Sequence, residues 1–155
     1  MKLTTLLKDK ATGRDVEITG LTADSRAVKA GFLFAALPGT QVDGAKFIDA
    51  AIKAGAVAIL CRPDAVGQDD NVVWISDPVP ARLFAYIVGR FFDRQPETIA
   101  AVTGTNGKTS VASFTQQIWD HMGYKAGMIG TLGVSGPGIS RETGMTTPDP
   151  VTLQA

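Results

Sequence analysis

The hydrophobic positions in the first 95 residues alternate between short continuous runs and runs with helical spacing. Asp43 precedes a stretch, residues 47–52, whose apolar side chains repeat with helical spacing, and Gly55 follows it as a terminator. A second amphipathic stretch, residues 83–91, follows Asp77-Pro78, which we interpret as an N-cap with proline at the first helical position. Buried strands are predicted for the short apolar runs 31–37, 56–61 and 72–75. This alternation of strands and helices predicts an α/β domain.

The pattern breaks at residues 93–97, which are polar and contain a proline, so we place a domain boundary between residues 95 and 96. Beyond it the pattern predicts a strand at 98–102, a helix from Ser110 to Gly123, a parallel strand at 126–130, a glycine-rich loop at 133–144 and a helix starting near 151. One strand–loop–helix–strand unit cannot bury a nucleotide-binding sheet, which needs several covered parallel strands. We therefore expect the chain to be a fragment of a longer protein.

The segment between the predicted strand 98–102 and the predicted helix has the composition of a phosphate-binding loop. Its residues are Gly104, Thr105, Asn106, Gly107, Lys108, Thr109 and Ser110. Glycines let the backbone approach phosphates closely, and the N-terminus of the following helix favours negative charge. Lys108 can reach the β- and γ-phosphates, and the Thr109 hydroxyl can hold Mg²⁺. The segment predicts a nucleoside-triphosphate site.

This loop departs from the common G-x-x-x-x-G-K-[ST] pattern, because Val102 stands where that pattern has its first glycine. The departure disfavours a generic P-loop ATPase or GTPase and favours a family with its own variant. The alternative is an ordinary glycine-rich strand-to-helix turn with a solvent-exposed lysine.

Composition limits the other functions that the chain could have. Lys plus Arg and Asp plus Glu each number 15, so there is no excess basic charge for nucleic-acid binding. The one cysteine, Cys61, lies in an apolar run and is interpreted as a buried structural thiol, and no internal disulfide can form. No signal peptide and no apolar stretch of about 20 residues is present, so we expect a cytoplasmic protein that does not enter a membrane.

Four segments together resemble the Mur ligase family, the ATP-dependent amide-forming enzymes of peptidoglycan synthesis. They are residues 22–26 (T-A-D-S-R), residues 31–47, the phosphate loop 104–110, and residues 130–133 with 146–150 (T-T-P-D-P). The phosphate loop alone is also similar to that of folylpolyglutamate synthetases. The D-S-R and T-T-P-D-P segments are most similar to those of the ligases that add the third residue of the stem peptide.

The resemblance implies an α/β fold in two parts. Residues 1–95 would form a small N-terminal domain that binds the UDP-muramoyl substrate. Residues 96–155 would begin a central, P-loop-type ATP-binding domain with a parallel sheet. The amino-acid-binding domain of such ligases would lie outside this chain, so we expect the 155 residues alone to be inactive.

The resemblance also implies roles for individual residues. Lys108 would be the catalytic cation within the ATP-binding loop, and Thr109 would be a ligand of Mg²⁺. The UDP-substrate contacts would come from Ala23, Ser25, Thr40, Gln41, Val42, Thr146 and Thr147. Asp24 and Arg26, beside Ser25, could instead form a surface ion pair or turn cap. Segment 40–42 could equally be an ordinary loop.

The reaction implied is transfer of the ATP γ-phosphoryl group to the D-glutamate carboxylate, giving an acyl phosphate that the amine of a diamino acid attacks. The substrates would be UDP-N-acetylmuramoyl-L-alanyl-D-glutamate and meso-diaminopimelate, in a monomeric enzyme. Three alternatives remain open: an L-lysine-adding ligase, the fourth-step ligase that adds a dipeptide, and a non-catalytic module that binds a UDP-sugar or nucleotide.

Overall fold

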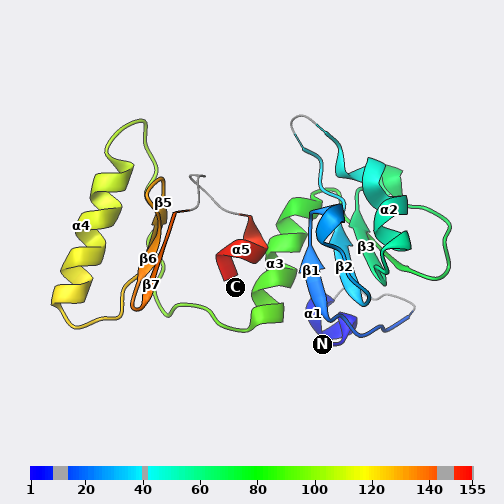
Figure 1. Ribbon diagram of the computed structural model, residues 1–155, viewed down its shortest axis with the longest axis horizontal. Helices are drawn as coiled ribbons and strands as arrows, with labels where there is room; N and C mark the ends of the chain where they lie inside the picture. Colours follow the sequence, from blue (N-terminus) through cyan, green and yellow to red (C-terminus); the bar gives the residue numbers. More distant parts are fainter. Residues whose placement is uncertain (9–13, 40–41, 143–148, 155) are drawn as a thin grey trace. The chain divides into compact units, whose positions relative to one another are not determined.

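The computed structural model describes residues 1–8, 14–39, 42–142 and 149–154, and these form two compact units. The first unit comprises residues 1–95 together with residues 150–154. The second unit comprises residues 96–149. Figure 1 colours both along the sequence.

The first unit is built on a four-stranded parallel sheet with the strand order β1-β2-β3-β4. Its strands are β1 (Gly20–Thr22), β2 (Phe32–Ala35), β3 (Ala58–Cys61) and β4 (Val73–Ser76). The predicted strands at 31–37, 56–61 and 72–75 are confirmed as β2, β3 and β4, each within two residues of its expected limits. The apolar pattern had not singled out β1, which is only three residues long.

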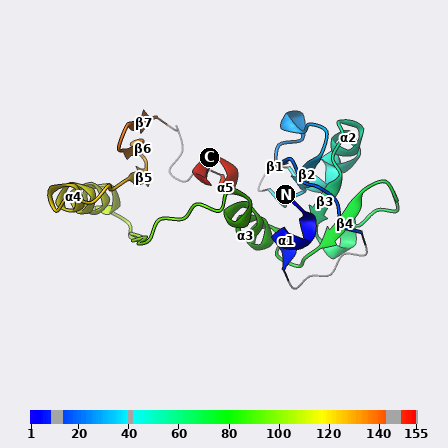
Figure 2. The same ribbon diagram turned by 90° about the horizontal axis from the view of Figure 1, so that it is seen from below.

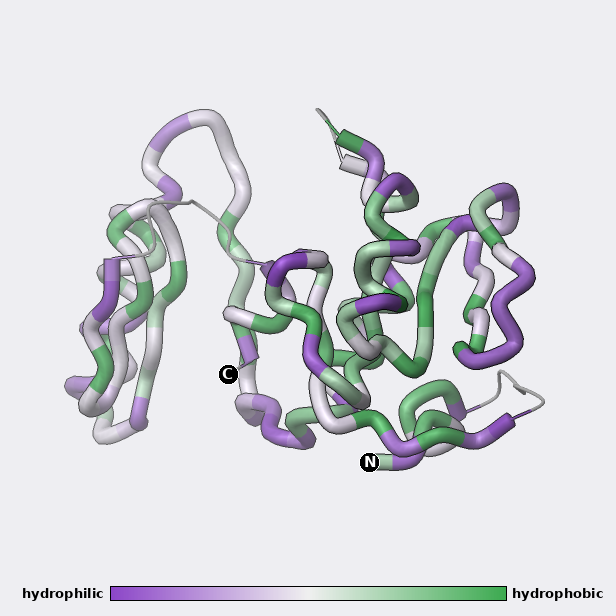
Figure 3. Tube along the Cα trace, turned by 45° about the vertical axis from the view of Figure 1, so that its right-hand side comes forward, coloured by the Kyte–Doolittle hydropathy of each residue, from purple (hydrophilic) through white to green (hydrophobic). Residues whose placement is uncertain are grey.

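Both faces of this sheet are buried, which explains why strands β2, β3 and β4 lie in continuous apolar runs. Leu33 and Ala35 face a core formed with α1 (Leu3–Leu7) and α3 (Pro80–Phe92). Phe34 belongs to a second core, with α2 (Ile48–Lys53), on the opposite face. Figure 2 shows the helices on the two sides of the sheet, and Figure 3 shows hydrophobic residues following its strands.

The helices begin and end near the predicted signals, with one correction. Asp43 caps the 3₁₀ helix Gly44–Phe47 (η2), which leads directly into α2, and Gly55 follows with a φ of 102°. The helix predicted to start at Pro78 begins instead at Pro80. The Asp77 carboxylate accepts a hydrogen bond from the Val79 N–H at 2.8 Å, so it orders the turn before the helix rather than capping it.

The remaining elements of the first unit are short. Two more 3₁₀ helices follow strands β1 and β3, at Ser25–Ala27 (η1) and Pro63–Ala65 (η3). The C-terminal helix α5 (Pro150–Gln154), where the sequence predicted the start of a helix, packs against α3. Cys61 is fully buried, and burial raises the pKa of its thiol, in agreement with a structural role.

The second unit contains helix α4 (Lys108–His121) and a three-stranded antiparallel sheet. The strands are β5 (Met128–Gly130), β6 (Gly133–Gly136) and β7 (Ile139–Arg141). Three predictions for this half were wrong in detail. Residues 98–102 form no strand, since none of the described segments pairs with them. The strand near 126–130 pairs antiparallel with β6, and most of the predicted loop 133–144 is the β6–β7 hairpin.

The apolar stripe of α4 is exposed in this structure. Phe114 retains 63% of its accessible surface, and the same stripe continues through Val111, Ile118 and Met122, which are also exposed. None of the helices among the described residues is long and apolar enough to cross a membrane.

Candidate functional site

The predicted phosphate loop lies between residues 96–103, which form no helix or strand, and the N-terminus of α4. Gly104 and Gly107 adopt positive φ angles of 147° and 77°, which side-chain-bearing residues rarely adopt. A Cβ atom at Gly107 would meet nothing within 4 Å, so glycine is required there for its backbone conformation rather than for space. Residues 104–107 are exposed, and Gly107 is the N-cap of α4.

Helix α4 begins at Lys108, two residues earlier than predicted, so Lys108 and Thr109 belong to its first turn. No side chain caps this helix, and its first turn holds no acidic residue. Unpaired N–H groups and the positive end of the helix dipole therefore face the loop, which favours an anion.

The Lys108 side chain folds back over the loop instead of extending into solvent. Its ammonium donates a hydrogen bond to the carbonyl of Gly104 and a longer one, at 3.4 Å, to the carbonyl of Thr105. The positive charge is thus held beside the loop N–H groups. This is the placement that a cationic phosphate clamp requires.

Thr109 and Ser110 complete the loop motif. The Thr109 hydroxyl lies 2.8 Å from that of Thr131, which follows β5. Ser110 is exposed on the first turn of α4. Thr131 was not identified as a site residue from the sequence, although it lies in segment 130–133, because it is 22 residues away from Thr109 and only the fold brings the two together.

The residues of this loop could bind a nucleotide phosphate, but they offer only one side-chain ligand, Thr109, for Mg²⁺. The loop supplies backbone donors, one cation and a helix N-terminus, which are the parts of a phosphate cradle. Among the described residues there is no cluster of three or more histidine, cysteine, aspartate or glutamate side chains that could hold a metal ion. Thr109 would therefore be one protein ligand, with phosphates and water supplying others, as is usual for Mg²⁺.

The candidate substrate residues of the first unit lie where its parallel strands end. Because β1, β2, β3 and β4 run in the same direction, their carboxyl ends share one edge of the sheet. Ala23 and Ser25 follow β1, Val42 lies beyond β2, and Arg62 follows β3. Ala23 and Val42 are exposed and Ser25 is half-buried. In open α/β sheets, this edge is where ligands generally bind.

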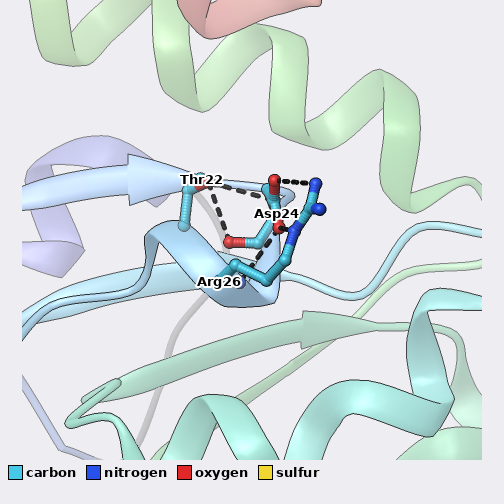
Figure 4. Close-up of polar contacts among 3 residues, drawn as sticks. All are labelled: Thr22, Asp24 and Arg26. Carbon is cyan, nitrogen blue, oxygen red and sulfur yellow. Dashed lines mark hydrogen bonds and ion pairs between the residues drawn. The ribbon is translucent and has the colours of Figure 1, made fainter.

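The turn after β1 is built by side-chain hydrogen bonds, shown in Figure 4. The Thr22 hydroxyl accepts from the Asp24 N–H at 3.0 Å, and Asp24 caps η1 by accepting from the Arg26 N–H at 2.9 Å. The Arg26 guanidinium also donates one hydrogen bond to each carboxylate oxygen of Asp24, at 2.9 and 2.7 Å. These contacts lower the pKa of Asp24 to about 2.

Asp24 and Arg26 therefore form the surface ion pair and turn cap that the sequence left as an alternative to a ligand role. Their contacts hold the backbone on either side of Ser25. Four predicted substrate residues, Thr40, Gln41, Thr146 and Thr147, lie outside the described residues.

Segment 38–44, beyond β2, is anchored by a residue that sequence reasoning missed. Arg62 donates to the Asp43 carboxylate at 2.8 Å, although the two are 19 residues apart. The only signal in the sequence is that Arg62 directly follows a predicted buried strand, where a charge marks the strand end.

Comparisons with known proteins show which family the chain is similar to. Residues 17–103 match the Mur ligase family, catalytic domain, and residues 102–155 match the Mur ligase middle domain. The UDP-N-acetylmuramoyl-L-alanyl-D-glutamate--2,6-diaminopimelate ligase of Brucella melitensis is 49% identical over 155 residues, covering 99% of this chain and 32% of the relative. The chain thus spans about a third of the length of this curated relative.

Two solved structures have a similar fold. A UDP-N-acetylmuramoyl-L-alanyl-D-glutamate--2,6-diaminopimelate ligase aligns over 99% of this chain and 32% of its own, with a TM-score of 0.76 and 24% identity. The MurF ligase of Thermotoga maritima, solved in complex with ADP, aligns over 65% of this chain and 23% of its own, with a TM-score of 0.51 and 25% identity. With family matches that run from residue 17 to the end, the chain belongs to the Mur ligase family.

Proposed function

We propose that this chain is the N-terminal portion of an ATP-dependent ligase that adds meso-diaminopimelate to UDP-N-acetylmuramoyl-L-alanyl-D-glutamate. The observation that carries the proposal is the loop at 104–109. Its two glycines have positive φ angles, and its lysine folds back over it at an uncapped helix N-terminus. The 49% identity to a diaminopimelate ligase supports this substrate over L-lysine.

The two parts of the sequence, residues 1–95 and 96–155, would have different roles. Residues 1–95 would bind the UDP-muramoyl substrate, using Ala23, Ser25 and segment 40–42 at the carboxyl edge of the parallel sheet. Residues 96–155 would begin the ATP-binding domain and contribute the phosphate loop, together with Thr146 and Thr147 for the muramoyl peptide. A related MurF ligase was solved in complex with ADP, which supports nucleotide binding in this family.

Amide formation needs an activated carboxylate, because a carboxylate is a poor electrophile. Transfer of the γ-phosphoryl group of ATP to the D-glutamate carboxylate gives an acyl phosphate and ADP. The amine of the diamino acid then attacks the acyl carbon, and phosphate leaves. Lys108 and the loop N–H groups would stabilise the charge on the transferring group by position rather than by covalent chemistry.

Mg²⁺, when bound with ATP, would neutralise phosphate charge beside the Thr109 hydroxyl. The remaining catalytic groups of the ligase would lie outside these 155 residues, so the chain alone should not form product. We further propose a cytoplasmic, monomeric enzyme whose partners are its substrates, without nucleic acid or membrane.

The first experiment measures ADP release by the full-length ligase that carries this chain. The UDP-dipeptide is supplied together with meso-diaminopimelate, with L-lysine, with D-alanyl-D-alanine or with no acceptor. We expect release that requires both the UDP-dipeptide and diaminopimelate. ADP release with L-lysine but not with diaminopimelate would show that the acceptor is L-lysine.

Two other outcomes would contradict the proposal more deeply. Release that requires a UDP-tripeptide and D-alanyl-D-alanine would identify the fourth-step ligase. A folded protein that binds ATP or the UDP-dipeptide but releases no ADP with any acceptor would be a binding module.

A further inference from the structure

Segment 38–44 follows β2 and carries Val42. Its two ends are joined by backbone contacts, and we call this joined part the base of the segment. Pro38 and Asp43 pair as an isolated antiparallel bridge, and the Gly44 N–H donates to the Leu37 carbonyl at 2.9 Å. The two described ends of the segment are therefore tied together directly above the carboxyl end of β2.

This base leaves no room for larger residues. A Cβ atom added to Gly39 would lie 2.5 Å from the Val42 carbonyl oxygen, and one added to Gly44 would lie 2.6 Å from the Leu37 carbonyl oxygen. Both neighbours are backbone atoms, which cannot rotate away as a side-chain end could. The close approach of the two ends of the segment therefore depends on glycine at positions 39 and 44.

Asp43 connects this base to the rest of the sheet edge. One carboxylate oxygen accepts from the Ala45 N–H at 3.0 Å and so caps η2. The other accepts from the guanidinium of Arg62 at 2.8 Å. Each side chain is only about one-third exposed, at 32% for Asp43 and 36% for Arg62, so the pair is better protected from solvent than most surface ion pairs.

Arg62 is itself held in place. It directly follows β3, whose hydrogen bonding extends past the strand ends, because the Ala36 N–H donates to Leu60 and the Asp77 N–H donates to Cys61. Its Nε also pairs with Asp64 at 3.3 Å. The guanidinium therefore links the rigid end of β3 to the base of segment 38–44.

We propose that Arg62 is a positioning residue for binding of the UDP-muramoyl substrate, acting through Asp43 on the segment that carries Val42. This inference rests on the proposed function of that segment. Arg62 need not touch the substrate. Its role is to hold the base of the segment at the sheet edge where the uridine nucleotide would bind.

The test uses the full-length ligase and four variants. Arg62→Met removes the charge and keeps the length of the stem, whereas Arg62→Lys keeps one charge. Asp43→Asn keeps an oxygen that can accept from Ala45 but loses the charged partner of Arg62. Asp64→Asn is the matched control, since it breaks the other ion pair of Arg62 and leaves the one to Asp43.

We expect Arg62→Met and Asp43→Asn to weaken binding of the UDP-dipeptide, measured by calorimetry without ATP, by about five- to tenfold. The KM for this substrate should rise with it, while kcat and the KM for ATP stay within about twofold. Arg62→Lys should recover part of the affinity, and Asp64→Asn should match the parent.

If Arg62→Met and Asp43→Asn both bind the UDP-dipeptide as tightly as the parent, this inference is wrong, while the proposed function still stands. A parallel fall in kcat, in both KM values and in the thermal midpoint would also overturn it, since that pattern indicates general loss of structure. If Arg62→Met fails to fold, Asp43→Asn decides. A parent enzyme that does not bind the UDP-dipeptide would overturn the proposed function, and this inference with it.

Discussion

The side-chain hydroxyl groups of Thr109 and Thr131 lie 2.8 Å apart, joining the first turn of α4 to the turn after β5. A threonine that binds a cation through an oxygen lone pair must send its proton elsewhere. Thr131 is placed to accept that proton, because either hydroxyl can be donor or acceptor. The pair would thus orient the Thr109 oxygen toward Mg²⁺.

Replacing Thr131 by valine should therefore weaken the response of the full-length ligase to Mg²⁺. Loss of one hydrogen bond corresponds to about a three- to tenfold higher Mg²⁺ concentration at half-maximal effect. The readouts are turnover and the Mg²⁺-dependent thermal shift with ATP. Thr131→Ser retains the hydroxyl and should resemble the parent. Identical Mg²⁺ curves for valine and threonine would show that Thr131 does not orient Thr109.

Lys108→Ala should reduce ATP-dependent turnover by about 10²- to 10³-fold, because the ammonium held over the loop would no longer stabilise charge on the phosphates. Binding of the UDP-dipeptide should remain mostly intact, since its proposed contacts in residues 1–95 do not involve this side chain. Steady-state kinetics and calorimetry separate the two effects. Lys125→Ala, an exposed lysine outside the loop, is the control. Loss of both ATP-dependent turnover and UDP-dipeptide binding in Lys108→Ala would mean that the two sites are not separable.

Asp24 should remain ionised to unusually low pH. Hydrogen bonds from Arg26 lower its pKa from 3.8 to about 2, so the folded state favours the carboxylate. The resulting stabilisation is fully present above about pH 3.8 and is lost as the pH falls through about 2. Carboxyl NMR titration of the 155-residue chain should show this midpoint.

Arg26→Met should shift the Asp24 midpoint upward toward 3.8, with the remaining backbone hydrogen bond limiting the change. Its destabilising effect, followed by urea unfolding, should be largest near neutral pH and should shrink toward pH 2. Arg94→Met, in the segment after α3, should leave the titration of Asp24 unchanged. An Asp24 midpoint near 3.8 in the parent chain would contradict the role of the Arg26 contacts.

Strands β2, β3 and β4 of the first unit could be predicted from the sequence, because burial on both faces makes them uninterrupted apolar runs, whereas the short elements α1 and β1 were missed. In the second unit the sequence predicted helix α4 and a strand at β5, but not the pairing of the strands, because pairing depends on hydrogen-bonded partners elsewhere in the chain. Residues 98–102 have an apolar pattern but no partner among the described segments. Residues 133–141 look like a glycine-rich loop, yet they pair with each other as a hairpin.

The candidate site divides along the same line. The phosphate loop is contiguous in sequence, so its glycines, Lys108 and Thr109 could be identified together. Thr131 and Arg62 could not, since their partners are 22 and 19 residues away and only the fold brings them together. Two interpretations of Asp24 stayed open because a carboxylate beside an arginine is compatible with both a ligand site and a turn cap.

Phe84 and Phe114 each lie on the apolar stripe of a helix, but replacing them by alanine should change the free energy of unfolding by very different amounts. Phe84 is fully buried between α3 and the parallel sheet, whereas Phe114 on α4 is 63% exposed. In urea unfolding of the 155-residue chain, Phe84→Ala should cost about 3–5 kcal/mol through lost contacts and a cavity. Phe114→Ala should change the free energy of unfolding by about 0.5 kcal/mol or less, as expected at an exposed position. A cost for Phe114→Ala as large as that for Phe84→Ala would mean that the apolar stripe of α4 is covered in solution.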